Sequence, residues 1–270
     1  MGHQLLKTLV RGVRHAGGWR RFHPPFDALE LEHDALVGLT RLWSRIHWSP
    51  GDGMMPADQL LAVYRLAATW PVPGDVVELG AWVGLTTSYL AGACRVRNQG
   101  KVYAVDTFTG VKEGNTTYPS VARYGGDTRR AFEERIQQAG VTDIVEPLVG
   151  LTTDVADIYP GRPIRLLLID ADHSYDGVRR DFECWSPHVA AGGLIIFHDY
   201  LMPQIARFVD GIVKHEPGYV MAPGHVVPNV FAVTKRGRDS RTACRATRAD
   251  RVEPGGADAP AKVHTAEAPA

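Results

Sequence analysis

From residue 56 onward, short apolar runs alternate with amphipathic stretches, and this alternation constrains the fold more than any other feature of the chain. Five runs have the length of a buried strand and lie at 76–80, 101–106, 144–150, 164–170 and 194–199. Runs that are apolar on both faces are typical of a parallel sheet covered by helices on each side. The sequence therefore predicts a core of parallel strands.

The segments between these runs have the periodicity of helices. Apolar residues recur at helical spacing in 60–70, 86–96, 128–140 and 175–189. Strand and helix in repetition predict an α/β fold, namely a Rossmann-like, doubly wound, mostly parallel sheet with helices on both faces. A last run at 229–236 predicts a late strand, for which an antiparallel orientation is left open.

The composition divides the chain into three segments. Residues 1–54 are predicted to form an N-terminal helical extension, and 55–236 to form the ligand-binding domain. Residues 237–270 have almost no large apolar side chains, so this tail is predicted to be disordered. Within the first segment, residues 4–14 interleave apolar and basic side chains at helical spacing. This helix could pack on its own domain, pack on a second subunit of a homo-oligomer, or make a weak contact with an anionic membrane surface.

Charge and cysteine content exclude several classes of function. Thirty basic residues balance thirty acidic ones, so the whole chain has no field that would favour nucleic acid as a partner. Cys94, Cys184 and Cys244 are far apart and form no CxxC pair, which argues against a zinc knuckle, a redox motif or a disulfide framework. Reduced thiols and the lack of a membrane-spanning apolar run predict a cytoplasmic protein.

The first strand is followed by a glycine-bearing loop that reads ExGxxxG, from Glu78 through Gly80 to Gly84. Both glycines are candidate ligand contacts, because glycine lets the backbone turn tightly and approach a ligand. A dinucleotide loop would read GxGxxG, and Trp82 stands where its middle glycine would be, so a dehydrogenase is disfavoured. Glu78 would repel a pyrophosphate but could receive an ammonium group. A purely structural turn, with Trp82 as ordinary packing, is the alternative.

Asp106 ends the second strand, at the edge of the sheet where ligands bind in this class of fold. A carboxylate at this place can accept hydrogen bonds from both hydroxyls of a ribose. Capping of a turn is the alternative role, because aspartate is common in turns. The combination of the ExGxxxG loop and a strand-ending acid indicates a nucleoside ligand with an amino-acid group.

Three segments of the chain resemble class I methyltransferases, and more narrowly the bacterial branch of macrolide- and aminocoumarin-sugar O-methyltransferases. They read VVELGAWVGLTTSYLA, VYAVDTF and LLLIDADHSYDGVRRDFE…GGLIIFHDY. The resemblance implies that 55–236 is an S-adenosylmethionine-binding methyltransferase domain. It also implies that Glu78 and Gly80 flank the methionine end of the cofactor and that Asp106 holds the ribose. The loop after the third strand, with Thr152, would lie near the adenine.

Acids and histidines follow the fourth and fifth strands, at Asp170, Asp172, His173, His198 and Asp199. Adjacent parallel strands lie about 4.8 Å apart, so their ends can bring these side chains into one cluster beside the cofactor methyl group. Asp170 is therefore also a candidate cofactor contact. Asp170 and Asp199, with His198 as a further ligand, could hold Mg²⁺. His173 is the candidate general base. Capping of the next helix is the structural alternative.

The related sugar methyltransferases place their metal-binding acid at Asp170, their catalytic histidine at His173 and a second acidic pair at His198-Asp199, where a histidine replaces one carboxylate. The predicted function is S-adenosylmethionine-dependent O-methylation of a hydroxyl on a sugar-containing or other polar small molecule, with possible help from Mg²⁺. N-methylation of an amino sugar stays open, as do a related hydroxylase and a non-catalytic nucleotide-binding module. Residues 109–127 are polar and glycine-bearing, which is typical either of a lid over the acceptor or of a surface loop.

Overall fold

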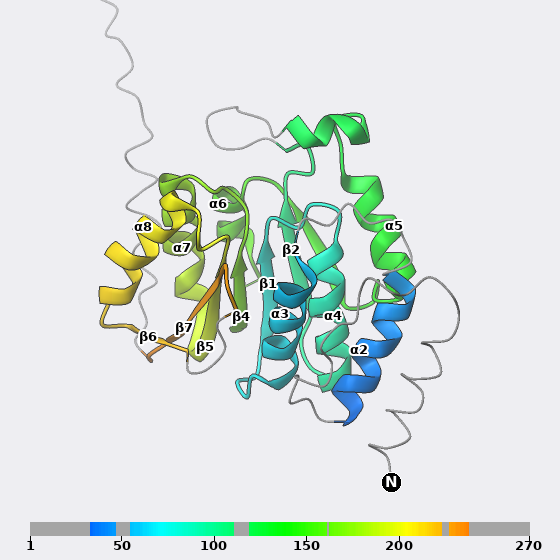
Figure 1. The fold of residues 1–270 in the computed structure, drawn as a ribbon, viewed down its shortest axis with the longest axis horizontal. Helices are drawn as coiled ribbons and strands as arrows, with labels where there is room; N and C mark the ends of the chain where they lie inside the picture. The colour runs from blue at the N-terminus through cyan, green and yellow to red at the C-terminus, as the bar shows by residue number, and fades with distance from the viewer. Residues whose placement is uncertain (1–32, 47–54, 111–118, 161, 223–226, 238–270) are drawn as a thin grey trace, which may run out of the picture.

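Seven strands form one sheet in the order β3-β2-β1-β4-β5-β7-β6 (Figure 1). The structure is a computed structural model, and it describes residues 33–46, 55–110, 119–160, 162–222 and 227–237. The strands are β1 (Asp75–Leu79), β2 (Val102–Asp106), β3 (Val145–Val149), β4 (Ile164–Ile169), β5 (Val189–His198), β6 (Tyr219–Met221) and β7 (Val230–Lys235). The helices are α2 (His33–Ile46), α3 (Ala57–Thr69), α4 (Leu85–Arg97), α5 (Arg129–Ala139), α6 (Thr152–Val155), α7 (Tyr175–Trp185) and α8 (Pro203–Gly211).

Strands β1 to β5 are parallel, as the apolar runs predict, and β7 is antiparallel to both β5 and β6. The predicted α/β fold is confirmed. From β1 the chain first adds β2 and β3 on one side, then returns to add β4 and β5 on the other. The reversal of direction between β1 and β4 is the point where open α/β sheets bind ligands, outside the carboxyl ends of the strands.

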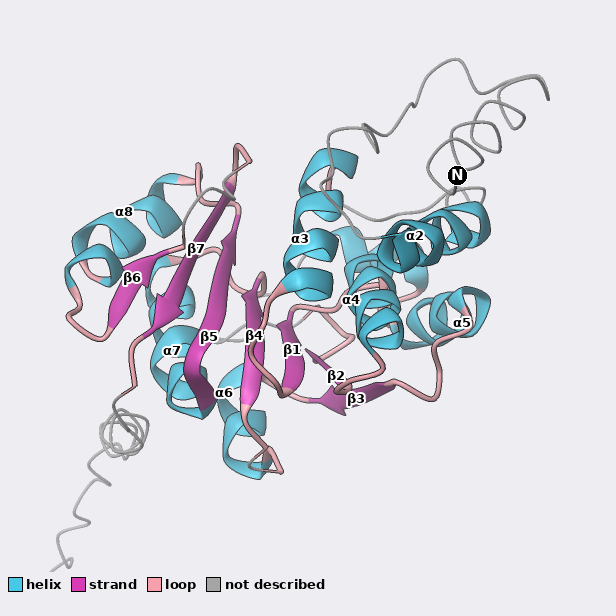
Figure 2. Cartoon of the chain, turned by 90° about the horizontal axis from the view of Figure 1, so that it is seen from below, coloured by secondary structure: helices cyan, strands magenta, loops and turns pink. Residues whose placement is uncertain are grey.

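Helices cover both faces of the sheet, with α2, α3, α4 and α5 on one face and α6, α7 and α8 on the other (Figure 2). Alternation along each strand divides the core between the two faces. Side chains that pack under the first set of helices are Val76, Val102, Leu166, Leu168 and Ile196. Those that pack under the second set are Val77, Val105, Leu167, Ile169 and Phe197.

Helix α2 lies within the predicted N-terminal extension. Its apolar side chains Leu39, Leu42 and Trp43 belong to the same buried cluster as α3 and α4. Gly38 and Gly92 make this packing close, because a β-carbon on Gly92 would lie 2.9 Å from Leu42 and one on Gly38 would overlap Val96. The helix therefore packs on the sheet domain.

The core also buries two cationic side chains that the apolar pattern of their strands does not indicate. Arg165 of β4 is fully buried and donates to the carbonyl oxygen of Ala67, at the end of α3, over 2.6 Å. Lys235 of β7 donates to three carbonyl oxygens in 186–189, at distances of 3.0 to 3.1 Å. Each cation thus satisfies carbonyl groups at the end of a helix, where the helix dipole also favours positive charge.

Strand β3 differs from the predicted pattern of strands buried on both faces. It lies at the edge of the sheet, is only partly buried, and leaves the side chain of Val149 57% exposed. The predicted helix over 4–14 and the predicted disordered tail after residue 237 lie outside the described residues. Among the described residues, no helix has the length and apolar content needed to cross a membrane.

Candidate active site

The loop between β1 and α4 turns at the two glycines of the ExGxxxG pattern. Gly80 has φ +91° and donates its N–H to the carbonyl oxygen of Val105 over 2.8 Å. A β-carbon at this position would lie only 2.1 Å from the carbonyl oxygen of Asp170. Gly84 has φ +78° and is the N-cap of α4, with the ring of Phe132 against it. Both positions therefore require glycine, Gly80 because β4 approaches closely and Gly84 because of the helix start.

Asp106 holds this loop in place. Its Oδ2 accepts the N–H of Trp82 and its Oδ1 accepts the N–H of Phe108, both over 2.7 Å. Burial raises the pKa of Asp106, and the backbone hydrogen bonds oppose that rise. Trp82 adopts φ +49°, and its ring meets the ring of Tyr124 edge-on at 5.6 Å. Asp106 thus caps two turns, and it also lines the cavity into which the loop opens.

Glu78 lies at the carboxyl end of β1 and is 1% exposed. Its Oε2 accepts a hydrogen bond from the hydroxyl of Thr87 on α4. Burial raises the pKa of Glu78 to about 8, so this carboxyl is largely in its neutral form at neutral pH. A cationic group bound beside Glu78 would favour its ionised form.

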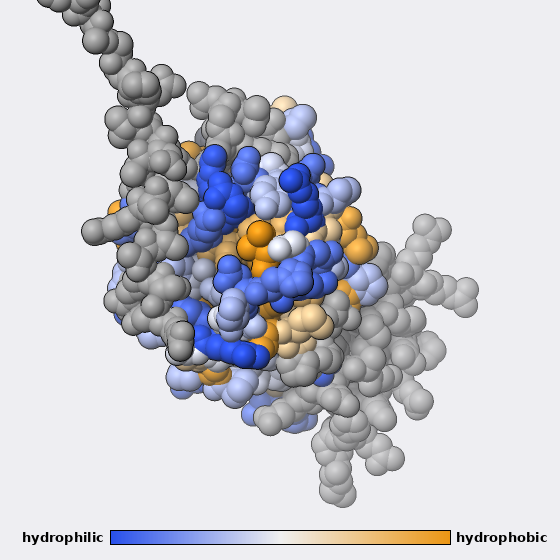
Figure 3. Space-filling view, turned by 90° about the vertical axis from the view of Figure 1, so that its left-hand side faces the viewer, coloured by the Kyte–Doolittle hydropathy of each residue, from blue (hydrophilic) through white to orange (hydrophobic). Residues whose placement is uncertain are grey.

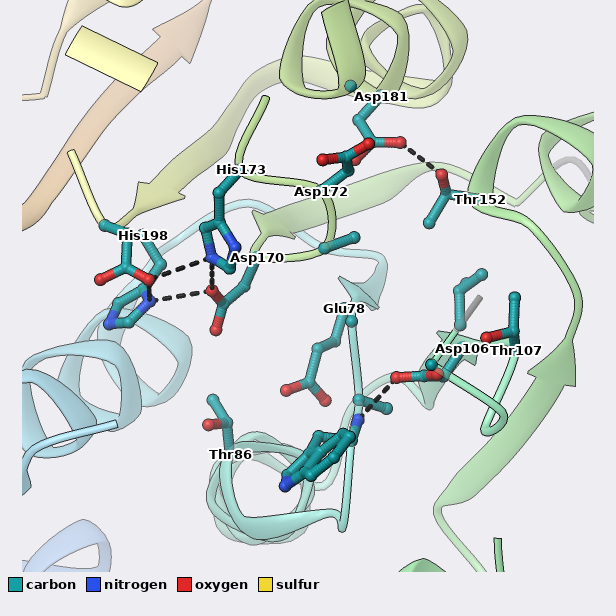
Figure 4. A pocket seen from close by; sticks show the side chains of 18 of the residues that line it. Glu78, Thr86, Asp106, Thr107, Thr152, Asp170, Asp172, His173, Asp181 and His198 are labelled. Carbon is teal, nitrogen blue, oxygen red and sulfur yellow. Dashed lines mark hydrogen bonds and ion pairs between the residues drawn. The ribbon is translucent and has the colours of Figure 1, made fainter. Parts of the chain in front are cut away.

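Four of the five predicted polar residues after β4 and β5 meet in one cluster (Figure 4). Nε2 of His173 lies 3.0 Å from Oδ2 of Asp199 and 3.6 Å from Oδ1 of Asp170. Nδ1 of His198 lies 2.9 Å from the same oxygen of Asp170 and 3.4 Å from Oδ2 of Asp199. We call Asp170, His173, His198 and Asp199 the acid–histidine cluster.

The charges within this cluster stabilise one another. Burial lowers the pKa of His173, but hydrogen bonds to Asp170 and Asp199 outweigh it and raise the pKa to about 9. The same two carboxylates raise the pKa of His198 to about 10 against the effect of burial. Hydrogen bonds from His173 and His198 hold the pKa of Asp199 far below its usual range. The ordinary histidine pKa near 6.5 therefore does not apply to His173 in this cluster.

The geometry of His198 differs from the predicted metal-ligand role. Its Nδ1 faces Asp170, and its Nε2 lies 2.7 Å from Oε1 of Gln59 on α3. Both ring nitrogens therefore have partners within the protein. The group whose ligand atoms all lie within 4.8 Å of one another consists of Asp170, His173 and Asp199. In this arrangement His173, and not His198, is the third side chain that could face a cation.

Two residues that the sequence did not single out position the cluster. Gln59 reaches His198 from α3, and its side chain is 7% exposed. Asn229, just before β7, donates to Oδ1 of Asp199 over 2.7 Å and accepts the N–H of Leu201 over 3.0 Å. Asp199 and Asn229 both have positive φ, at +53° and +73°. Asn229 thus fixes a strained turn that aims the Asp199 carboxylate at His173.

Asp172 does not join the acid–histidine cluster, contrary to the prediction. Its Oδ1 accepts the N–H of Ser174, and its side chain lies over Gly177 of α7. Figure 4 shows Asp172 beside Asp181, near Thr152. The hydroxyl of Thr152 donates to Oδ1 of Asp181, which is 2% exposed. Asp181 is a further site residue that the sequence analysis missed.

One cavity of about 510 Å³ joins these groups across the carboxyl ends of the strands. The predicted site residues that line it are Glu78, Gly80, Trp82, Asp106, Thr152, Asp170, Asp172, His173, His198 and Asp199. Gly84 does not line it. The acid–histidine cluster is at the end over β4 and β5, and Asp106 is over β2. The side of the molecule that carries α8 and β6 bears apolar side chains among polar ones (Figure 3). Met202, at the start of α8, is 41% exposed and also lines the cavity.

Residues 77–200 match the family described as "Methyltransferase domain", a segment that runs from β1 to the residues directly after β5. The fold is similar to that of the O-methyltransferase NovP, with 18% identity over 76% of this chain and 100% of that chain and a TM-score of 0.62. It is also similar to cofactor-bound Rv0187 from MTB, with 17% identity, 81% and 100% of the two chains covered, and a TM-score of 0.53. A third similar fold is that of the O-methyltransferase TomG from Streptomyces achromogenes, in complex with SAM. The two chains are 14% identical over 78% of this chain and 92% of that chain, with a TM-score of 0.50.

Proposed function

We propose that this chain, whose residues 77–200 match a methyltransferase domain as its resemblance predicts, transfers the methyl group of S-adenosylmethionine to a hydroxyl group of a sugar-containing or other polar small molecule. One observation carries this proposal: a single cavity joins Glu78 and Asp106 to the acid–histidine cluster. The first two residues suit the amino-acid and ribose groups of the cofactor. The cluster suits an acceptor that must lose a proton.

The cofactor end is assigned from charge and position. Glu78, buried at the end of β1, would receive the ammonium group. Asp106 accepts backbone N–H groups on both of its oxygens and lines the cavity, where its carboxylate would also accept the ribose hydroxyls. S-adenosylmethionine supplies a methyl group that is already activated on a sulfonium centre. Solved O-methyltransferases of the same fold, one of them described in complex with SAM, support this assignment.

At the acceptor end, His173 would take the proton of the hydroxyl on Nδ1, because its Nε2 faces Asp170 and Asp199. The acceptor oxygen would form its bond to the methyl carbon as the bond from that carbon to the sulfonium sulfur breaks. Asp170 and Asp199 orient this imidazole and stabilise the imidazolium that forms. Because their charges raise the pKa of His173 to about 9, the neutral base becomes available as pH rises toward that value. The rate with a hydroxyl acceptor should therefore rise between pH 7 and 9.

The two carboxylates of the cluster also fit a divalent cation. A carboxylate oxygen of each residue and a ring nitrogen of His173 all lie within 4.8 Å of one another, and carboxylate oxygens are the ligands that Mg²⁺ prefers. We propose Asp170 and Asp199 as the residues that would hold it, with His198 orienting Asp170 from behind. A cation bound there would lower the pKa of an acceptor hydroxyl.

N-methylation of an amino sugar is the second candidate, and the raised pKa of His173 favours it. At neutral pH this side chain is protonated and cannot act as a base, whereas an uncharged amine can accept a methyl group before it loses a proton. An amine acceptor should therefore react without His173 as a base. His173→Ala distinguishes the two candidates, because it should lower the rate with a hydroxyl acceptor and leave the rate with an amine acceptor nearly unchanged.

The test has two stages. Calorimetry should show binding of S-adenosylhomocysteine and no binding of NAD. Tight binding of NAD together with no binding of S-adenosylhomocysteine would overturn the proposal. Transfer of labelled methyl groups is then measured with a panel of glycosides and amino sugars, with EDTA and with added Mg²⁺. His173→Ala should lower the rate with a hydroxyl acceptor by about 10²–10⁴. Turnover that resists EDTA would reject the metal and keep His173.

We also propose that the acceptor is a small molecule and that the protein is cytoplasmic. The acid–histidine cluster opens into a cavity and not onto a flat surface, which suits a small acceptor. Cys94 and Cys184 are buried free thiols, which suits a reducing compartment.

A further inference from the structure

Two hydrogen bonds join helix α7 to Thr152, the first residue of α6, in the segment that follows β3. The hydroxyl of Thr152 donates to Oδ1 of Asp181, and the carbonyl oxygen of Thr152 accepts the indole N–H of Trp185 over 2.9 Å. Asp181 and Trp185 are four residues apart on α7, so they lie on the same face of the helix. Trp185 is fully buried, which fixes this face against the sheet.

The other end of the loop is bound to Asp106. Gly150 donates its N–H to the carbonyl oxygen of Asp106 over 3.0 Å, and its φ of +154° carries the chain out of β3. The loop 150–153 is thus held between Asp106 on one side and α7 on the other. Asp106, Thr152 and Asp181 all line the same cavity.

Burying the carboxyl group of Asp181 at this position costs free energy. It is 2% exposed, and among the described residues its Oδ2 has no hydrogen-bond partner. Burial raises the pKa of Asp181 to about 7, and the nearby charge of Asp172 raises it further. A buried polar atom without a partner costs free energy, so packing alone would favour an apolar residue of the same size. The contact to Thr152 is what the carboxyl group adds.

We propose that Asp181 is a positioning residue for the base of the nucleoside: it holds Thr152, and with it the loop 150–153, as the cavity wall next to Asp106. This proposal rests on the proposed function, which places the ribose at Asp106. The reacting methyl group must face the acid–histidine cluster over β4 and β5. The base therefore extends from the ribose in the opposite direction, over β2 and β3, where this loop lies.

The test compares two probes by calorimetry, S-adenosylhomocysteine and methylthioadenosine, which lacks the amino-acid group. Asp181→Val removes the acceptor of the Thr152 hydroxyl at similar size, and it should raise the Kd of both probes by the same factor, about tenfold, the effect of losing one net hydrogen bond. Asp181→Asn keeps a carbonyl oxygen that can accept the hydroxyl of Thr152, so its Kd values should stay within about threefold of the wild-type values. Glu78→Gln, at the amino-acid end, should weaken S-adenosylhomocysteine only.

Two further variants make the result specific. Thr152→Val should reproduce the loss, and the double variant with Asp181→Val should add little to it, because both remove the same contact. Asp176→Val changes an exposed carboxylate on the same helix, outside the cavity lining, and should leave both affinities unchanged. If Asp181→Val does not fold, Thr152→Val carries the test alone.

The outcomes separate the two proposals. Wild-type affinity for both probes in Asp181→Val or Thr152→Val would overturn the role of Asp181 and leave the methyltransferase site standing. A loss confined to S-adenosylhomocysteine would also overturn it, because the base end would then be unaffected. A wild-type protein that binds neither probe would overturn the proposed function and this inference with it.

Discussion

Replacing Asp106 by alanine tests whether its carboxylate is part of the fold as well as part of the site. The side chain accepts the N–H groups of Trp82 and Phe108, both over 2.7 Å, and the first of these belongs to the loop after β1. Alanine leaves both donors without their partner. We expect Asp106→Ala to lose stability and cofactor affinity together.

The magnitude follows from the two hydrogen bonds. A hydrogen bond to a charged group contributes about 1.5–3 kcal/mol, and partial access of water to the cavity reduces what is lost. We therefore expect the free energy of unfolding to fall by about 2–4 kcal/mol. Asp127→Ala is the matched control, because Oδ1 of Asp127 accepts the N–H of Arg129 over the same 2.7 Å and at the same spacing, but in an exposed turn. That loss should be about 1 kcal/mol, typical of an exposed cap.

Urea unfolding followed by circular dichroism measures both variants against the wild type, and calorimetry with S-adenosylhomocysteine measures binding. If Asp106→Ala costs no more stability than Asp127→Ala, the reasoning that burial strengthens these two hydrogen bonds is refuted. If stability falls as expected and affinity does not change, Asp106 is a structural cap and the ribose is held by other groups.

Three other predictions concern stability and are measured by urea unfolding. Burial raises the pKa of Glu78 from 4.5 to about 8, so its contribution is fully present below pH 4.5 and is lost as pH rises toward 8; Glu78→Gln should flatten that decline. Asn229→Gly should cost about 2 kcal/mol through its two side-chain hydrogen bonds, whereas Asn98→Gly, at another left-handed position, should cost a few tenths. Lys235→Met leaves three carbonyl oxygens without their donor and should cost about 3 kcal/mol or more.

The sequence was sufficient for the parts of the structure that depend on local pattern. Period and run length predicted strands β1 to β5 and β7, and helical spacing predicted α3, α4, α5 and α7. Residues that directly follow a parallel strand share one edge of the sheet, so the sequence alone predicted that Asp106, Asp170 and His173 lie near one another. The short strand β6, with three residues, has no such pattern.

The parts that the sequence could not predict depend on contacts between distant segments. Gln59 and His198 are 139 positions apart, and no spacing rule relates them. The contact with Gln59 is also why His198 differs from its predicted role as a metal ligand. Asp172 was expected in the cluster because of its position after β4, but the missing side chain at Gly177 provides the space in which Asp172 lies over α7. The glycine in the first turn of the next helix was the available signal.

The electrostatics of the cavity connect its two ends. Asp170 and Asp199 face His173 and His198, whose pKa values they raise, so at neutral pH two negative charges balance two positive ones. Glu78, whose pKa burial raises to about 8, adds no full charge to the cavity at neutral pH. An incoming ammonium group would favour the ionised form of Glu78, and the proton released would leave a carboxylate paired with that ammonium. The sulfonium charge of the donor would remain, next to a cluster with no net charge. Removal of the proton from His173 would then give the cluster a net negative charge, which favours binding of the cationic donor. The same step would leave His173 in the neutral form that can act as a base.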